Sequence, residues 1–410
     1  ATQNIGNGSY STADPYVKKV WDGRYTGIRM CNELLENIDR VPDLDPELKK
    51  RYIGEAKVLR AYSYYELYTK FGDIPYTTKV LSIKESMSIA RTAKATVIAN
   101  VLADLDEVIN GNYLPTSYDA DNKGRITRWA AMAIKAKIYL FEGNWTQVKN
   151  ITSTIMTEGG FKLFGSYAGL FEIANEYNSE VILDAQYRPT SREHQMMYVF
   201  LPPTLGGYSQ LSPLQELVDS YIMLDGKTIK ETGTSFDESH PYANRDPRLK
   251  ATVMYTGNSY TLADGTEVVI NCEKGEGKDG YGVGSDCSAT GYYIKKYWDN
   301  TYRATLYSGL NPILIRYADI LLMNAEALAE LGELDKTAWD ATIKPIRDRA
   351  GFTLASALEF PEGASKDKLI EIVRNERRSE LALEGHRHKD IIRWSCLLYT
   401  SPSPRDLSTS

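Results

Sequence analysis

Apolar residues recur at helical spacing over two long stretches near the start of the chain. In residues 17–38 the recurring positions are Val20, Ile28, Leu34, Leu35 and Ile38. Pro42 ends this pattern, which predicts a first helix. Residues 48–71 repeat the behaviour until Gly72-Asp73-Ile74-Pro75 stops it. The connection between the stretches 17–38 and 48–71 is short, which predicts that the two helices form an antiparallel pair.

The same spacing predicts further helices on both sides of the middle of the chain. They cover residues 97–109, 128–141, 145–156, 314–331, 336–350, 365–383 and 389–394. Gly72, Gly143 and Gly332 follow alanine-rich and Tyr/Leu-rich helices, and glycine permits the left-handed backbone that reverses a chain. Such recurring helix pairs are typical of tetratricopeptide-like (TPR-like) stacking. The period is irregular, so we predict a TPR-like arrangement only.

The middle of the chain has a different pattern. Short β-prone runs at 181–186, 251–255, 267–271 and 291–295 lie among Gly, Pro, Ser and Asp clusters. The predicted fold is therefore mostly α, with a TPR-like scaffold of helix pairs and a loop-rich insertion that contains short β-strands. Its parts are a scaffold in 1–160, the insertion in 161–312, the C-terminal helices of the same scaffold in 313–394 and a tail in 395–410. Long loops on a rigid scaffold often carry binding residues, so 161–312 is the candidate ligand-binding region.

Charge and hydropathy exclude several classes of protein. The 410 residues carry 48 Lys and Arg against 54 Asp and Glu, and no long basic stripe is present, so nucleic acid is not an expected partner. No segment approaches the roughly 18 to 20 apolar residues that span a bilayer, and we expect the chain as given to be soluble. No GxSxG, HExxH or P-loop motif indicates an active site or a cofactor, and none is expected.

The cysteines and the acidic loop leave two questions open. Cys31, Cys272, Cys287 and Cys396 form no CxxC pair, so no zinc site is predicted. Cys272 and Cys287 could pair in an exported protein or remain free thiols. The acids Glu273, Glu276, Asp279 and Asp286 could hold a cation, although a solvated loop is the commoner structure for such a run.

Tyrosine is unusually frequent, with 29 residues beside 9 Phe and 6 Trp. In residues 292–303, aromatic rings alternate with amide, carboxylate and guanidinium groups. A sugar presents a C–H face that stacks on such rings and hydroxyls that need fixed polar partners. The candidate ligand-binding residues are Trp298, Tyr302, Tyr293, Asn300, Arg303, Tyr307, Asp73 and Tyr76. The alternative is that Tyr292, Ile294 and Tyr297 are simply the core of a strand.

The densest charged run covers residues 375–387 and admits two interpretations. Glu380 and Glu384 could be the acid and base of a glycoside hydrolase, which needs two carboxyl groups about 5 to 10 Å apart. Alternatively, the arginines of this run bind carboxylates and helix-end carbonyls and lock helices together. The second role needs no substrate and is the one we favour.

The chain resembles the SusD/RagB family over almost all of its length. The matching residues are Tyr25-Thr26-Gly27-Ile28, Cys31-Asn32, Asn37-Ile38-Asp39, residues 54–62, 71–75 and 130–145, Leu211-Ser212-Pro213, Glu216-Leu217-Val218-Asp219 and residues 315–322. The most specific stretch combines Asn375-Glu376-Arg377-Arg378 with Glu380, Glu384-Gly385, Arg387, Asp390 and Arg393-Trp394. Each motif is modest alone, but their order along the chain is specific.

The resemblance implies a TPR-containing outer-membrane lipoprotein of Bacteroidota-type bacteria. Such a protein sits on the cell surface over a TonB-dependent, SusC-like transporter and captures glycans or, in some members, peptides, without catalysis. Family members contact sugars through variable loops, so the resemblance assigns no ligand residue here, and it makes the run 375–394 part of the scaffold. A TPR-like adaptor that binds only protein is a further alternative.

Both ends of the chain depart from the family pattern. The signal sequence and the lipidated cysteine are missing, so an N-terminal lipid anchor is inferred and lies outside this chain. Residues 395–410 change abruptly to a Ser/Pro-rich composition. We interpret this tail as foreign sequence on a truncated gene product and expect it to be disordered.

Overall fold

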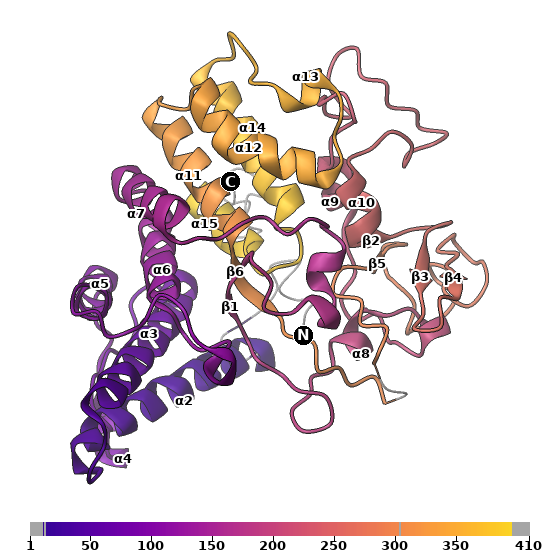
Figure 1. The fold of residues 1–410 in the computed structure, drawn as a ribbon. Coiled ribbons are helices and arrows are strands. Elements are labelled where there is room, and N and C mark those ends of the chain that lie inside the picture. The colour runs from indigo at the N-terminus through magenta and orange to yellow at the C-terminus, as the bar shows by residue number, and fades with distance from the viewer. Residues whose placement is uncertain (1–10, 12–13, 303–304, 396–410) are drawn as a thin grey trace, which may run out of the picture. The chain divides into compact units, whose positions relative to one another are not determined.

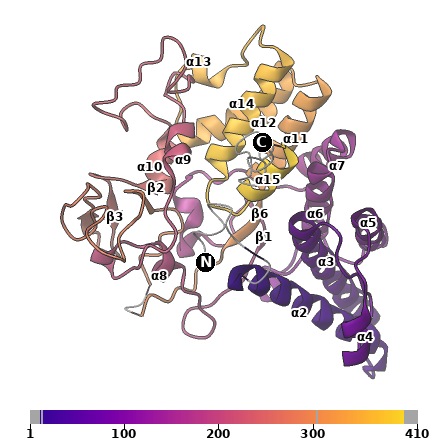
Figure 2. The same cartoon turned by 180° about the vertical axis from the view of Figure 1, so that it is seen from behind.

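The computed structural model of the chain describes residues 11, 14–302 and 305–395. The backbone contacts divide the protein into two units, residues 1–159 and 160–410, shown from opposite sides in Figures 1 and 2. The predicted insertion (161–312) and the predicted C-terminal helices (313–394) both fall in the second unit. The disordered tail predicted for 395–410 lies outside the described residues except for Ser395.

The first unit is built of helices that pack in sequence order. They are α2 (Pro15–Asn37), α3 (Pro46–Phe71), α4 (Ile83–Ser88), α5 (Lys94–Asn110), α6 (Arg128–Phe141) and α7 (Trp145–Glu158), with short 3₁₀ turns η1 (Ile38–Arg40) and η2 (Ala120–Asn122). Helix α2 packs on α3, α3 on α5, α5 on α6 and α6 on α7. The predicted helices of this unit are confirmed, whereas the short helix α4 was not predicted.

Local sequence explains where these helices begin and end. Asp14 and Asp45 accept hydrogen bonds from the first turns of α2 and α3, and a proline follows each of them at the first helical position. Thr127 caps α6 in the same way. After α3, Gly72 adopts a φ of +66°, which an L side chain would resist. The prediction of left-handed glycines at the helix ends is confirmed.

The second unit combines the longer helices α11, α12 and α14 with many short elements. Its helices are α8 (Met196–Phe200), α9 (Gln215–Ser220), α10 (Pro247–Thr252), α11 (Tyr317–Leu331), α12 (Lys336–Ala350), α13 (Ala355–Leu358), α14 (Lys366–Glu380) and α15 (Arg387–Arg393), with 3₁₀ turns η3 (Gly169–Phe171), η4 (Ile173–Asn175) and η5 (Pro203–Leu205). Helix α11 packs on both α12 and α14, and α14 also contacts α9 and α10. These contacts link the late helices to the loop-rich residues before them.

Among the described residues of this unit, the strands form three two-stranded antiparallel sheets. Strand β1 (Val181–Asp184) pairs with β6 (Ile313–Arg316), β2 (Val253–Met254) with β5 (Tyr293–Ile294), and β3 (Ser259–Thr261) with β4 (Glu267–Val269). Figure 1 shows β3 and β4 as a small hairpin. The prediction of short strands within a mostly helical chain is confirmed, although β3 was not foreseen.

The start of the predicted helix 314–331 is wrong. Residues up to Arg316 form strand β6 and the helix begins at Tyr317. A short apolar run such as Ile313–Arg316 fits a buried strand or a buried helix turn equally well, and only pairing with the distant β1 decides between them. The predicted helix 365–383 likewise ends earlier, at Glu380.

Candidate ligand-binding site

Trp298 of the second unit is held in one orientation by the β3–β4 hairpin. Its indole Nε1–H donates a hydrogen bond of 2.8 Å to the carbonyl oxygen of Thr261 at the end of β3. The ring packs against Tyr260, with ring centroids 4.9 Å apart, and remains partly exposed. A ring fixed by its edge and from beneath offers its remaining surface to a ligand without losing conformational freedom.

Tyr302 extends this aromatic surface. Its ring centroid lies 5.4 Å from that of Trp298, and its hydroxyl donates a hydrogen bond of 3.1 Å to the carbonyl oxygen of Leu205. Burial raises the pKa of the Tyr302 hydroxyl, which keeps it a neutral donor at physiological pH. We call Trp298 and Tyr302, with Tyr260 beneath, the aromatic platform.

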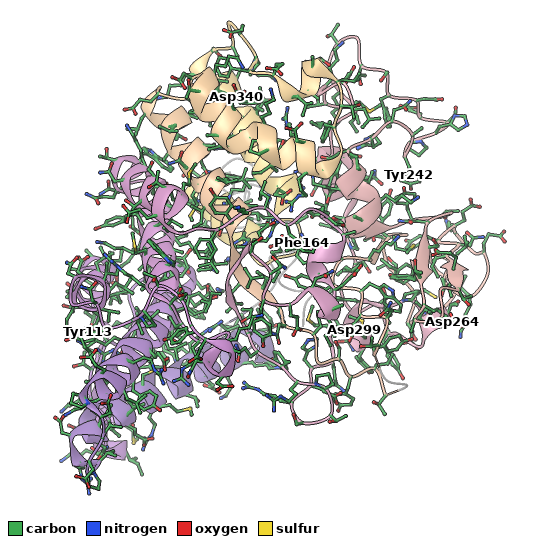
Figure 3. All side chains as sticks on the ribbon, in the orientation of Figure 1. Tyr113, Phe164, Tyr242, Asp264, Asp299 and Asp340 are labelled. Atoms are coloured by element: carbon green, nitrogen blue, oxygen red, sulfur yellow. The ribbon has the colours of Figure 1, made fainter. Side chains whose placement is uncertain are left out.

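The loop that carries the platform is pinned from inside. Asp299, labelled in Figure 3, is buried and accepts hydrogen bonds from the amide and hydroxyl of Thr301 and from the hydroxyl of Ser308 at 2.5 Å. Ser308 in turn exchanges two backbone hydrogen bonds of 2.9 Å with His194. Both ends of the segment between Trp298 and Ser308 are therefore anchored to buried polar groups.

The other candidates of this segment differ in accessibility. Asn300 is exposed, and Tyr307 exposes 38% of its surface. Arg303 lies outside the described residues. Asn300 and Tyr307 can reach solvent, so they stay candidate contacts.

Tyr293 is a core residue, which argues against its predicted role as a ligand contact. It is 0% exposed in β5, and its hydroxyl donates a hydrogen bond of 2.6 Å to the carbonyl oxygen of Asp279 and accepts one from the amide of Ser288. Tyr292, Ile294 and Tyr297 are also buried, as the strand-core interpretation expected. Alternation along a strand does not distinguish an inward ring from an outward one when both faces are covered.

Asp73 and Tyr76 belong to the first unit and serve its helices. A carboxylate oxygen of Asp73 accepts a hydrogen bond of 2.8 Å from the amide of Lys94, the first residue of α5. The ring of Tyr76 is half-buried, with its centroid 4.7 Å from that of Tyr64. Asp73 thus caps the start of α5, although it is not next to that helix in the sequence. No local pattern indicates this role, because 21 residues separate Asp73 from Lys94.

Further aromatic residues at the surface were missed by the sequence analysis. Tyr198 and Tyr208 stack with ring centroids 4.2 Å apart, and Tyr208 exposes 40% of its surface. Tyr242 and Tyr255 stack at 3.8 Å. The excess of tyrosine was the only signal for these pairs, because no periodic pattern in the sequence links position 198 with 208 or 242 with 255.

Within the charged run 375–387, Glu376, Arg377 and Glu380 are buried and form ion pairs, as the scaffold interpretation predicts. Glu380 is 0% exposed and contacts Arg248, Arg316 and Arg349. Burial alone would raise the pKa of Glu380, but these guanidinium groups outweigh it and hold the pKa well below the usual range. A carboxyl group in this state cannot donate a proton as a general acid near neutral pH.

Glu384 has the same character. Its carboxylate accepts hydrogen bonds from Arg316 and from Lys296 at 2.6 Å. Burial opposes ionisation, yet Arg316 and Lys296 lower the pKa of Glu384. Both carboxylates of the hydrolase hypothesis are therefore occupied by cations of the protein itself, which leaves this pair no catalytic role.

The geometry also answers whether Cys272 and Cys287 form a disulfide and whether the acidic loop has the side chains for a metal site. Cys272 and Cys287 are free thiols, so they do not form a disulfide. Asp279 is buried and accepts hydrogen bonds from the amide and hydroxyl of Thr204. Over residues 14–302 and 305–395, no group of three His, Cys, Asp or Glu side chains could hold a metal ion.

Comparison with known proteins agrees with this geometry. The family model described as "SusD family" matches residues 170–405, and one described as "Starch-binding associating with outer membrane" matches residues 2–140. The chain therefore belongs to the SusD family, and the resemblance found in the sequence is confirmed.

Individual relatives support the same assignment. SusD-like protein P25 of Formosa agariphila is 28% identical over 406 residues, which cover 93% of this chain and 71% of the relative. The crystal structure of a SusD-like carbohydrate-binding protein from Bacteroides fragilis has a TM-score of 0.84 and 28% identity, and covers 94% of this chain and 75% of the other. A second SusD-like protein from the same species has a TM-score of 0.80 and 29% identity, over 95% of this chain and 77% of the other. The predicted SusD-like, mostly helical fold is confirmed.

Among the helices within the described residues, none combines the length and the apolar character that crossing a bilayer requires.

Proposed function

We propose that this protein binds glycans at the cell surface and delivers them to a TonB-dependent, SusC-like transporter, without itself making or breaking bonds. The observation that carries the proposal is the aromatic platform, a partly exposed Trp298 beside Tyr302 on a pinned loop. Flat rings of fixed orientation complement the C–H face of a sugar, and the exposed Asn300 offers an amide for hydroxyl groups.

Membership of the SusD family supports the ligand class and the location. One matching family model is described as starch-binding and associated with the outer membrane, and a relative of 28% identity is a carbohydrate-binding protein. Delivery to a transporter follows from the resemblance drawn from the sequence, as does an N-terminal lipid anchor outside this chain. The buried ion pairs of Glu380 and Glu384 favour binding over hydrolysis.

A binding screen with matched variants tests the proposal. The purified protein is titrated with neutral α- and β-glucan oligosaccharides and with oligopeptides of similar size. We expect Trp298→Ala to weaken oligosaccharide binding by about tenfold or more, equivalent to about 1.4 kcal/mol. Tyr16→Ala, which removes an exposed ring from α2 of the first unit, is the control and should bind like the wild type.

A second variant separates binding from stability. Trp298 packs on Tyr260 and hydrogen-bonds to Thr261, so its removal also lowers the free energy of unfolding. Asn300 is exposed, and Asn300→Ala should weaken sugar binding while thermal unfolding stays unchanged. Binding of peptides alone would assign the protein to the peptide-binding members, and no effect of either variant would contradict a site at the platform.

A further inference from the structure

A cavity in the first unit lies at the start of α3, and none of the candidate residues considered so far lines it. Its volume is about 490 Å³, within the range of small-molecule sites. The lining residues are Asp45, Glu47, Leu48, Arg51, Asn112, Tyr113, Leu114, Pro115, Thr116 and Arg128. They come from the first turns of α3, the loop after α5 and the first residue of α6.

This cavity has a rigid construction. The loop 112–116 presses on α3 at Gly54, where an added Cβ would come within 2.8 Å of the Cβ of Tyr113. On the other side, the amide of Arg128 donates a hydrogen bond of 2.9 Å to the carbonyl oxygen of Pro115. Tyr113, labelled in Figure 3, is further fixed by its hydroxyl, which donates to Glu107 at 3.0 Å.

Two arginines, Arg51 and Arg128, line this cavity. The Nε atoms of Arg51 and Arg128 are buried and have no hydrogen-bond acceptor. Neither guanidinium forms an ion pair with any carboxylate in the part of the chain that the structure describes. Arg51 instead faces the rings of Tyr52 and Tyr118, at 5.5 and 5.7 Å from their centroids. Because these Nε atoms are closed to solvent, a ligand in the cavity can reach only the remaining guanidinium nitrogens, which form no ion pair within the described residues and can bind an oxyanion in a fork geometry.

The acids that line the cavity do not pair with these arginines. A carboxylate oxygen of Asp45 accepts the amide of Leu48 at 2.8 Å, as the cap of α3. Glu47 is exposed and, although it lies four residues before Arg51, makes no ion pair with it. An oxyanion from outside the protein can therefore reach two guanidinium groups that form no ion pair within the described residues, although the charge of Arg51 also helps to lower the pKa of the exposed Asp119.

The rest of the lining suits a sugar ring. Tyr113 and Pro115 offer apolar surface, and Asn112 and Thr116 expose an amide and a hydroxyl. We propose that this cavity, which we call the Arg51–Arg128 pocket, binds an acidic saccharide unit that carries a carboxylate or a sulfate ester. The inference rests on the proposed glycan binding and adds a subsite, in the first unit, for the charged sugars of an acidic polysaccharide.

The test uses three oligosaccharides of equal length with the full chain. They are an oligogalacturonate, which carries carboxylates, a sulfated carrageenan oligosaccharide, and a neutral galactan oligosaccharide. We expect one or both acidic ligands to bind, and Arg51→Gln and Arg128→Gln each to lower that affinity about tenfold or more. Comparison of the first two ligands distinguishes carboxylate from sulfate.

A matched control removes the effect of net charge. Arg29→Gln changes the charge of the same unit equally, at an exposed position of α2 that pairs with Glu33. Its affinity for the acidic ligand should equal that of the wild type. Equal losses in Arg29→Gln and in the pocket variants, or no binding of either acidic ligand by the wild type, would overturn the inference.

Hydrogen exchange locates the site even where a variant folds poorly. Acidic ligand should slow exchange of wild-type amides in residues 46–52 and 112–116, and protection confined to other segments also contradicts the pocket. The outcome is separate from that of the proposed function. Trp298→Ala and the neutral glucans test the platform in the second unit, whereas the acidic ligands and the two arginine variants test the pocket.

Discussion

Single residues of this protein illustrate how little local sequence says about exposure. Tyr293 and Trp298 lie five positions apart in one aromatic-rich stretch, and both were proposed as ligand contacts. Tyr293 lies in β5 and is buried, and its hydroxyl forms hydrogen bonds with Asp279 and Ser288. Trp298 instead packs on the β3–β4 hairpin and keeps part of its ring in solvent. The partners that separate them are distant in sequence, so only tertiary structure assigns the two roles.

Gly54 gives a sharp test at the scale of one residue. In Gly54→Ala the new Cβ would meet Tyr113 at 2.8 Å and Leu114 at 3.1 Å. The overpacking should lower the free energy of unfolding by about 1–3 kcal/mol, measured by urea denaturation. The same substitution should also weaken the binding of an acidic ligand in the Arg51–Arg128 pocket, because the loop 112–116 must move away from α3.

The control for this substitution is Gly23→Ala in α2. Nothing lies within 4 Å of the added Cβ at this exposed position. Alanine favours a helix interior over glycine, so this variant should gain about 0.5–1 kcal/mol of stability. Equal effects of the two substitutions would mean that the loop does not press on α3.

At the scale of elements, the helices were predictable and their partners were not. Periodicity located α3, α6, α12 and most of α14 to within a few residues. Residues of β6 were assigned to a helix, because an apolar run of four residues carries no period of its own. The short helices α8 to α10 were also not predicted, because each is about as short as the turns around it.

The buried ion pairs join elements that the sequence leaves unrelated. Arg316 at the end of β6 contacts Glu180, Glu380 and Glu384, and Arg248 of α10 contacts Glu380 of α14. The run 375–387 indicated ion pairs for its own arginines. In pairs such as Arg248–Glu380 and Arg316–Glu180, however, the two partners are more than 100 residues apart in the sequence. Geometry alone shows that the carboxylates are shared between several cations.

Glu380→Gln tests whether this network stabilises the fold. It leaves Arg248, Arg316 and Arg349 without a shared buried charge, so the free energy of unfolding should fall by about 3–5 kcal/mol. Urea denaturation followed by circular dichroism measures the loss. Glu359→Gln, at an exposed pair with Lys336 and Lys344, should change little. A small effect at Glu380 would reopen the question of what this carboxylate does.

At the scale of the whole molecule, the family and the mostly helical fold could be predicted from ordered motifs, and a ligand could not. The motifs lie in helices and ion pairs that hold the fold, such as Arg377 with Asp319 and Asp390. The aromatic platform instead depends on loop contacts between residues 205, 261, 298 and 302, and the Arg51–Arg128 pocket on a gap between α3 and α6. Neither arrangement leaves a periodic signal in the chain.

The buried carboxyl groups also set how the stability of the protein depends on pH. Burial raises the pKa of Asp184 to about 6, against the hydrogen bond from Asn311, and raises that of Asp246. A carboxyl whose pKa is raised on folding makes the protein more stable as the pH falls through that value. Glu376, Glu380 and Glu384 have lowered pKa values, so their stabilisation is present above about pH 4.3 and is lost as the pH falls further.

The two effects together predict a maximum of stability in mild acid, near about pH 5. Urea denaturation between pH 3 and pH 8 should show the free energy of unfolding rising from pH 8 to the maximum and falling steeply below it. In Asp184→Asn the rise between pH 7 and pH 5 should shrink, because the group that takes up the proton is gone. Asp22→Asn, which makes the same charge change at an exposed position of α2, should retain the wild-type curve. A wild-type curve that declines steadily from pH 8 would mean that Asp184 ionises without cost, and that its contact with Asn311 compensates its burial in full.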